Sequence, residues 1–249
     1  MGQRQDAPEP AAQRRPGSRV HAELAEGIGR RILDGTYPPG SLLPNEAEWG
    51  RIYGASRTAV REAIKTLDGK GLLVSRPKIG SRVEPRERWN LLDRDVMAWH
   101  RAAMDERGFL HALQEIRRIL EPGAAVLAAR RRTPEQLATL DKALDDMRSA
   151  PDPQAMVEAD VRFHLALLAA ANNELLAPFG IIIEQALASM FDYTTRHSPH
   201  PEQVLPLHAA VVKAIAAQSP DQAKTAMETL LDDTDVILAS LGGIAVKEV

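Results

Sequence analysis

Three side chains of the kinds that bind metal ions lie in two segments of the C-terminal half. Asp160 and His164 are four residues apart in EADVRFHLALLAAANNELL, one turn apart on a predicted helix. His208 follows in VLPLHAAVVKAIAAQ, a predicted helix whose neighbours Val211 and Ile215 are expected core residues. A carboxylate and imidazoles can share one divalent metal. The alternative for Asp160 and His164 is a simple hydrogen bond on a helix surface.

A second group of side chains could contact nucleic acid. In SRTAVREAIKTLDGKG, Arg57 and Arg61 open a predicted helix that is capped by Ser56. An arginine can bind a guanine edge with two hydrogen bonds, and a helix N-terminus favours phosphate. A solvated helix face is the alternative interpretation of these arginines. The opposite face carries the predicted packing residues, which are Val60, Ala63, Ile64 and Leu67.

The segment after this helix, LLVSRPKIGSRVEP, predicts two short strands around a turn. Two helices, a turn, a third helix and a hairpin follow the order of a winged helix-turn-helix, whose third helix enters the major groove. A glycine in the hairpin would allow close approach to a phosphate or to the minor groove. The predicted DNA contacts are Ser56, Arg57, Thr58, Arg61, Arg76, Lys78, Gly80 and Arg82.

Composition and charge exclude several classes of protein and indicate the kind of partner. The 249 residues include no cysteine, which excludes disulfides, zinc fingers and thiol catalysis. We find neither a secretory leader nor an apolar stretch long enough to span a bilayer, so we expect a cytoplasmic protein without membrane contacts. The net charge is −3, yet residues 1–88 carry more basic than acidic side chains. A basic N-terminal segment is expected to meet a polyanion.

Hydrophobic periodicity predicts a mainly α chain: a winged helix-turn-helix with a small β-hairpin, then an all-α antiparallel helical bundle. We divide it into a disordered tail (1–18), the winged helix-turn-helix (19–88), a connector (89–108) and an all-helical effector-binding and dimerisation domain (109–245). The predicted helices are about 19–34 (capped by Ser18), 45–54, 56–71, 91–104, 109–130, 134–149, 153–171, 173–194, 201–218 and 220–240.

The segment from Gly40 to Val83 resembles, without a gap, the N-terminal domain of the GntR superfamily of bacterial transcription regulators. Its LPNE and SRTAVREAI motifs carry the resemblance. By this resemblance, Arg57 and Arg61 would contact bases or phosphates of double-stranded operator DNA. Many members have a further DNA-contacting arginine in the second helix. Ala47 stands there in this chain, so that contact is not carried over.

Residues 109–235 resemble the all-helical ligand-sensing domain of the FadR branch, called FCD. In many members one aspartate and three histidines hold a metal, and Asp160, His164 and His208 match three of these positions. The fourth position is Leu230. The resemblance therefore leaves two alternatives. Either three protein ligands hold zinc, nickel or manganese, with water and effector completing the shell, or the polar groups bind the effector without metal.

Two arginines are candidates to meet an anionic effector. Arg117 in EIRRILEP matches such a position in the family, with Glu121 one turn later, and an exposed Arg–Glu pair is its alternative. Arg196 is a second candidate, in a predicted loop. The segment RWNLLDRDVMAWH looks like the connector of galactonate-type sugar-acid regulators. That likeness favours a sugar acid, with fatty acyl-CoA, lactate, pyruvate and dicarboxylates as alternatives.

These observations lead us to expect a homodimeric, effector-responsive DNA-binding regulator, a repressor rather than an activator and not an enzyme. Two-fold symmetry would match a pseudo-palindromic operator. One alternative is a metal-dependent hydrolase that uses Asp160, His164 and His208 to activate water. No general base accompanies that cluster, and a hydrolase leaves the basic hairpin unexplained. A helical scaffold would explain neither group of side chains.

Overall fold

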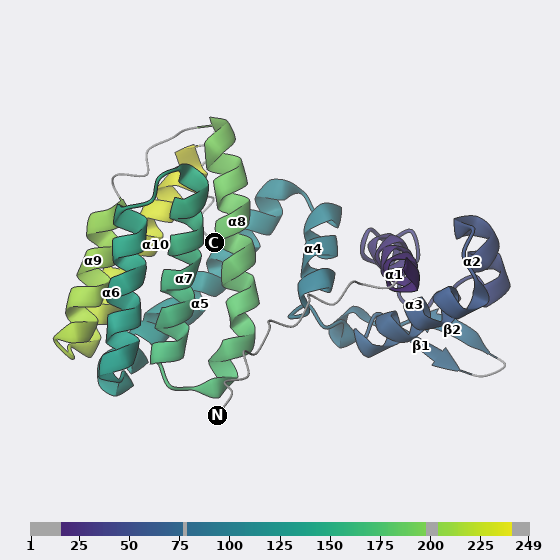
Figure 1. Cartoon of the computed structure of the whole chain (residues 1–249), viewed down its shortest axis with the longest axis horizontal. Helices are drawn as coiled ribbons and strands as arrows, with labels where there is room; N and C mark the ends of the chain where they lie inside the picture. Colours follow the sequence, from purple (N-terminus) through teal and green to yellow (C-terminus); the bar gives the residue numbers. More distant parts are fainter. Residues whose placement is uncertain (1–15, 77–78, 198–203, 241–249) are drawn as a thin grey trace, which may run out of the picture. The chain divides into compact units, whose positions relative to one another are not determined.

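The computed structural model describes residues 16–76, 79–197 and 204–240 (Figure 1). The chain divides into two compact units, Met1–Ala103 and Met104–Val249. The boundary between them lies within the predicted connector. Helices dominate both units, and the strands in the described residues form one antiparallel pair. The mainly α class, with a winged helix-turn-helix ahead of a helical bundle, is confirmed.

The N-terminal unit has the predicted order of elements. They are α1 (Pro16–Leu33), α2 (Glu46–Tyr53), α3 (Arg57–Gly69), β1 (Leu73–Arg76), β2 (Gly80–Val83), the 3-10 helix η1 (Arg86–Arg88) and α4 (Arg94–Ala103). Helix α1 begins two residues before Ser18, so the prediction that Ser18 caps this helix is wrong. Pro16 explains the earlier start, because its fixed φ suits the first position of a helix.

Local capping fixes both ends of α2 and the start of α3. The side chain of Asn45 accepts hydrogen bonds from the backbone amides of Ala47 and Glu48, and the Glu48 carboxylate accepts one from the Asn45 amide at 2.7 Å. This capping box starts α2. Gly54, with φ of 64°, ends it in the left-handed conformation that favours glycine. Ser56 then caps α3 by accepting from the Ala59 amide at 3.2 Å, as predicted.

The hairpin is anchored in the N-terminal core. Its strands pair Leu73 with Val83 at one end and Arg76 with Gly80 at the tip. Leu73 and Val83 are each 1% exposed. The core also contains the predicted face of α3 and the packed side chains of α1 and α2, which are Leu24, Ile28, Ile32, Trp49, Val60, Ala63, Ile64 and Leu67. Arg76 and Gly80 are therefore carried by a hairpin whose other end is buried.

Helix α4 also belongs to this unit, although it lies in the predicted connector. It packs against α1, and Trp89, Val96 and Trp99 are buried in the N-terminal core. Lys70, after α3, holds the N-terminus of α4 through an ion pair of 2.6 Å with Asp93. The Asp93 carboxylate also accepts hydrogen bonds from the amides of Asp95 and Val96.

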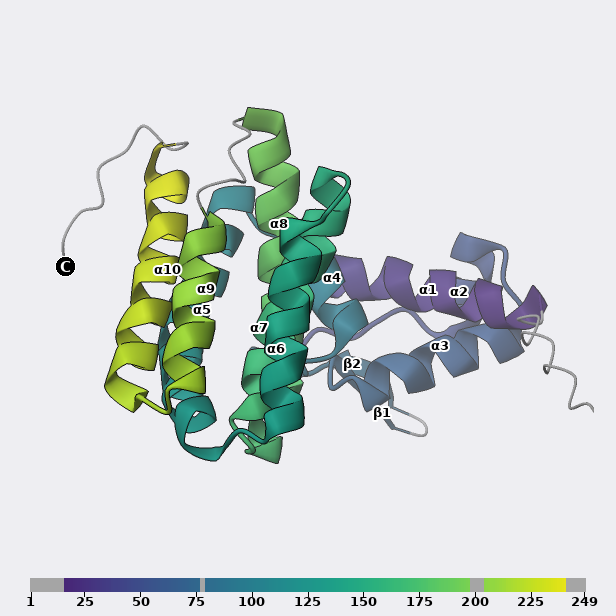
Figure 2. The same cartoon turned by 60° about the vertical axis from the view of Figure 1, so that its left-hand side comes forward.

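The C-terminal unit is a bundle of long helices (Figure 2). They are α5 (Glu106–Arg131), α6 (Pro134–Arg148), α7 (Pro153–Ala170), the 3-10 helix η2 (Glu174–Phe179), α8 (Gly180–His197), α9 (Val204–Ala216) and α10 (Pro220–Ser240). Helix α5 packs against α7, α8, α9 and α10. Side chains on several faces of α5 therefore lie in the interior of the bundle.

The single helix predicted over 173–194 is wrong, because η2 and α8 are separate elements. Pro178 lacks the amide hydrogen that a continuous α-helix would use, which explains the break. Asn173 caps η2 by accepting a hydrogen bond from the Leu175 amide at 3.2 Å. None of the helices in the described residues is both long and apolar enough to cross a membrane.

Candidate DNA interface and effector site

The first turns of α3 present the predicted cations to solvent. Arg57, Thr58 and Arg61 are exposed. Arg57 forms no hydrogen bond or ion pair with the residues that the structure describes. Arg61 Nε lies 3.4 Å from Glu46 Oε1, and both side chains are more than half exposed, so this pair contributes little to stability. No acidic residue lies in the first turn of α3, which keeps its positive dipole end uncompensated.

The hairpin contributes unequally to this face. Arg76 and Gly80 are exposed and face each other in the register at the tip. Gly80 has a φ of 98°, which side chains rarely adopt. The Arg82 guanidinium donates to the Gly40 carbonyl, so it holds the base of the hairpin as well as lying on its surface. Lys78 lies outside the described residues.

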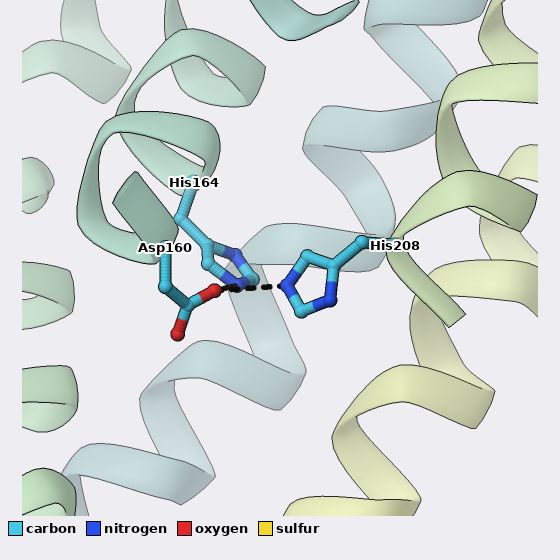
Figure 3. Close-up of side chains that lie close together, drawn as sticks. All are labelled: Asp160, His164 and His208. Atoms are coloured by element: carbon cyan, nitrogen blue, oxygen red, sulfur yellow. Dashed lines mark hydrogen bonds and ion pairs between the residues drawn. The ribbon is translucent and has the colours of Figure 1, made fainter. Parts of the chain in front are cut away.

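Asp160, His164 and His208 converge inside the C-terminal bundle (Figure 3). His208 Nε2 on α9 lies 2.9 Å from Asp160 Oδ1 on α7, and His164 Nε2 lies 3.4 Å from the same oxygen. His164 is 1% exposed and His208 is 3% exposed. The alternative of an Asp–His pair on a helix surface is therefore wrong. The side chains of two helices share one buried polar centre.

Both imidazoles are oriented through their other nitrogen. His208 Nδ1 lies 2.8 Å from the Val204 carbonyl, and because a carbonyl only accepts, Nδ1 carries the hydrogen. His164 Nδ1 lies 2.6 Å from Glu121 Oε2, an ion-pair contact whose geometry is not that of a hydrogen bond. Both Nε2 atoms are thereby left to face Asp160. Carbonyl and carboxylate partners of this kind commonly orient metal-binding histidines.

Arg117 completes the cluster from α5. Its Nε donates to Glu121 Oε1 at 2.6 Å, and its Nη2 lies 3.3 Å from His164 Nε2. Arg117 is 2% exposed and Glu121 is fully buried. The alternative of an exposed Arg–Glu pair is therefore wrong. A buried guanidinium that already has one carboxylate partner is directed at the polar centre.

The charges in this cluster depend on one another. Burial alone would favour neutral groups, but the charges of Arg117 and His164 lower the pKa of Glu121 to about 2. Burial likewise opposes a charge on His164, yet Glu121 and Asp160 raise its pKa to about 9. Burial of Asp160 is outweighed by its contacts with His164 and His208, which hold the pKa of that carboxyl far below its usual range. The opposite charges of the cluster therefore favour the ionised forms of Glu121, Asp160 and His164, against the effect of burial.

The donor set fits a divalent cation. Ligand atoms at roughly 2.0–2.2 Å from one ion lie about 3 Å from each other. The distances of 2.9 and 3.4 Å from Asp160 Oδ1 to the two Nε2 atoms agree with this spacing. The three ligand atoms lie within 4.8 Å of one another. Leu230, where the family resemblance would place a fourth ligand, is 3% exposed and packs in the apolar core.

Two buried polar residues, Gln114 and Ser189, were not predicted from the sequence. Gln114 is 4% exposed and lies one turn before Arg117, and its amide nitrogen donates to the Leu231 carbonyl while Oε1 has no partner in the described residues. Ser189 on α8 is 2% exposed, and its hydroxyl also has no partner there. The spacing of Gln114 from Arg117 and Glu121, at i, i+3 and i+7, was the signal for Gln114. Arg196 lies in the last turn of α8 and not in a loop, and its side chain is outside the described part.

Comparison with known proteins decides the family. Residues 21–83 match the family model of bacterial regulatory proteins, gntR family, and residues 112–233 match the FCD domain. The HTH-type transcriptional regulator YieP of Escherichia coli K12 is 36% identical over 218 residues, which cover 85% of this chain and 92% of that protein. The chain belongs to the GntR family.

Two further proteins agree with this assignment. The galactonate operon transcriptional repressor of Escherichia coli K12 is 34% identical over 206 residues, which cover 82% of this chain and 90% of that protein. The solved structure of a Streptococcus agalactiae GntR protein has a TM-score of 0.51 and 25% identity, covering 87% of this chain and 99% of that one. This GntR-family chain is a DNA-binding transcriptional regulator and not an enzyme, so the hydrolase and scaffold alternatives are rejected.

Proposed function

We propose that this GntR-family regulator is a cytoplasmic homodimeric repressor that leaves its operator when a sugar acid binds in the bundle. The observation that carries the proposal is the buried cluster of Arg117, His164 and Asp160, with Arg117 Nη2 3.3 Å from His164 Nε2. The Arg117 guanidinium, which is buried and fixed in place, can bind the carboxylate of an effector. The similarity to a galactonate operon repressor supports a sugar acid over a simple fatty acid.

Within this proposal, each side chain has a distinct role. Glu121 holds Arg117 by Nε, so that Nη2 is directed at the effector carboxylate. Gln114 Oε1 and Ser189 Oγ, which lack partners in the described residues, bind effector hydroxyls. Met190, the residue after Ser189, packs against the cluster of Leu110 and Leu238, and α8 packs against α5. A polyhydroxy acid would satisfy the polar groups that an apolar ligand would leave unpaired.

We further propose that Asp160, His164 and His208 hold a divalent cation, which would be zinc, nickel or manganese. When bound, the cation supplies a positive charge to which carboxylate and hydroxyl oxygens bind. Glu121 and the Val204 carbonyl keep the two imidazoles turned toward the ion. Leu230 leaves the ion with three protein ligands and keeps the remaining positions for water and effector.

The DNA contacts in this proposal are the exposed side chains on α3 and the hairpin. Arg57 and Arg61 bind base edges or phosphates, with Ser56 and Thr58 near the backbone. Arg76, Lys78, Gly80 and Arg82 form the hairpin contact. Effector binding can release the protein from DNA only if the effector has a higher affinity for the conformation that does not bind DNA. The difference between its two affinities sets how far the equilibrium shifts.

The test measures DNA release. The DNA upstream of the gene is labelled, the protein is titrated by fluorescence anisotropy, and a panel of aldonates, lactate, pyruvate and dicarboxylates is added. We expect at least a tenfold loss of affinity with an aldonate. His164→Ala should bind the DNA as the wild type does and lose the response, whereas His111→Ala, an exposed histidine, should keep it. Release by an aldonate that is equally strong in His164→Ala would contradict the proposed site.

A further inference from the structure

Two large aliphatic side chains are exposed at the hairpin of the N-terminal unit. Leu42 is 56% exposed and Ile79 is 59% exposed, so both lie outside the buried core of this unit. Ile79 precedes Gly80 at the hairpin tip, and its amide donates to the Arg76 carbonyl at 3.2 Å. Aliphatic surface in water is unfavourable, and a partner that covers these two side chains would gain free energy from their burial.

Backbone pairing holds Leu42 against the hairpin. Leu42 pairs with Arg82 in an antiparallel bridge, and the amide of Leu43 donates to the Ser81 carbonyl at 2.9 Å. Successive side chains of an extended segment point to opposite faces. Leu43 is 4% exposed and packs in the core, so Leu42 is held on the solvent side of the sheet.

The face of the sheet that carries Leu42 also carries two arginines. Residues paired directly across antiparallel strands share a face, and so do residues two apart in one strand. Leu42 therefore shares a face with Arg82. Gly80, two residues earlier, and its partner Arg76 lie on that face too. A Cβ added at Gly80 would lie 3.5 Å from Leu42 Cδ1, so the leucine side chain reaches the level of the glycine.

Charge and position select DNA as the partner of this face. Strand β1 runs back along α3 and packs against it, so the hairpin tip is directed toward the end at which α3 begins (Figure 1). When α3 lies in the major groove, the tip is on the side of the same duplex. Its guanidinium groups suit the phosphates that border the adjacent minor groove. Leucine and isoleucine are among the side chains that proteins insert into that groove.

We propose that Leu42 and Ile79 are apolar contacts to the minor groove of operator DNA, next to the major groove that α3 enters. The inference rests on the proposed contact of α3 with DNA. Because these side chains offer no hydrogen-bonding group, they do not identify bases by their edges. They favour sequences whose minor groove opens or bends at low cost, such as those with pyrimidine–purine steps. The two residues thus add specificity where α3 makes no base contact.

Salt dependence separates an apolar contact from a cationic one. The double variant Leu42→Ser with Ile79→Ser is titrated with the DNA upstream of the gene at several salt concentrations. We expect it to bind about tenfold more weakly than the wild type, with an unchanged slope of log affinity against log salt. Arg76→Ala should instead reduce that slope by about one. Leu175→Ser is the matched control and should bind as the wild type does, because Leu175 is 79% exposed but lies on η2 in the other unit.

Inosine substitution in the same duplex tests the minor groove itself. Inosine lacks the amino group that guanine presents in the minor groove and keeps the major-groove pattern of guanine. We expect the wild type to bind the inosine duplex at least threefold more tightly than the unmodified one, and the double serine variant to show no such gain. Thermal unfolding of the variant should match that of the wild type, because both replaced side chains are exposed.

Two results would overturn the proposal. One is wild-type affinity of the double serine variant for the upstream DNA, and the other is an equal inosine effect in both proteins. Loss of binding in Arg57→Ala together with wild-type affinity in the double serine variant would leave the proposed contact of α3 intact and remove the apolar contact alone.

Discussion

His208 Nε2 lies 2.9 Å from Asp160 Oδ1, although the two residues belong to different helices and are 48 positions apart. Because Asp160 lies on α7 and His208 on α9, this contact joins the two helices, and His164 Nε2 lies 3.4 Å from the same oxygen. Phe163 covers both imidazoles in edge-on contact, with ring centroids 5.4 and 4.8 Å away. The arrangement holds two histidine nitrogens and one carboxylate oxygen together in the interior of the bundle.

His208→Ala tests the metal-binding role of this cluster. We expect zinc, nickel or manganese to raise the melting temperature of the wild type, because an ion that binds only the folded state stabilises it by about 2.7 kcal/mol at 100 times its dissociation constant. The variant should lose this shift, while His111→Ala retains it. Differential scanning fluorimetry with and without chelator measures the effect. Equal metal-induced shifts in both variants would exclude His208 as a ligand.

Glu121→Gln tests the buried ion pair with Arg117. Removing one partner leaves the other charge buried and uncompensated, and such changes cost about 3–5 kcal/mol. We therefore expect a large fall in the free energy of unfolding by urea. The double variant Arg117→Met with Glu121→Leu should lose less than Glu121→Gln, because no buried charge is left alone. Wild-type stability in Glu121→Gln would show that water satisfies the guanidinium.

Asp93→Asn tests the link between α3 and α4 through its pH dependence. Burial would raise the pKa of Asp93, but hydrogen bonds from Lys70 and backbone amides outweigh burial and lower it. A lowered pKa contributes stability above the unfolded value of about 3.9, and that contribution is lost as pH falls through the folded-state pKa. Asparagine can still cap α4 but carries no charge.

We therefore expect the Asp93→Asn variant to be less stable at neutral pH by about 1 kcal/mol, and to lose less stability than the wild type as pH falls below about 4. Urea denaturation at a series of pH values measures the difference. Asp95→Asn, with a side chain that is 64% exposed, is the control and should have a smaller effect. Parallel pH profiles for Asp93→Asn and the wild type would contradict the role of this ion pair.

Ser189→Ala tests the hydroxyl-binding groups. The Ser189 hydroxyl is buried without a partner in the described residues, so its removal should leave stability unchanged or raise it by up to about 1 kcal/mol. The dissociation constant for an aldonate should nevertheless rise, and calorimetry measures it. Ser149→Ala, at the end of α6, is the matched control. Unaltered aldonate binding in Ser189→Ala would remove this residue from the site.

The fold of the N-terminal unit follows closely from local sequence signals. Ser56 as the cap of α3 and the buried face of Val60, Ala63, Ile64 and Leu67 were both predicted and are confirmed. Capping and helical periodicity act within a few residues, so a single sequence contains them. The start of α1 and the break at Pro178 were missed, because each depends on one proline: Pro16 suits the first position of a helix, whereas Pro178 interrupts an otherwise favourable helical pattern.

The candidate site was harder to predict. The spacing of Asp160 and His164 placed them on one face, but the burial of Arg117 and Glu121 could not be derived from their spacing. An i, i+4 Arg–Glu pair has the same spacing on a surface and in a core. Arg117 and Glu121 are buried because α7, α8, α9 and α10 pack against α5. His208 was a candidate because its predicted helix carries core residues, and the family resemblance then matched it to the same site as Asp160 and His164.

The central claim is that α3 binds operator DNA through the guanidinium groups of Arg57 and Arg61. The most direct measurement is the affinity of Arg57→Ala and Arg61→Ala for the upstream DNA of the gene, by anisotropy at fixed salt. We expect each variant to lose about 1–3 kcal/mol of specific binding. Arg148→Ala, the same change on an exposed side chain of α6, should bind as the wild type does. Wild-type affinity in both α3 variants would contradict the account.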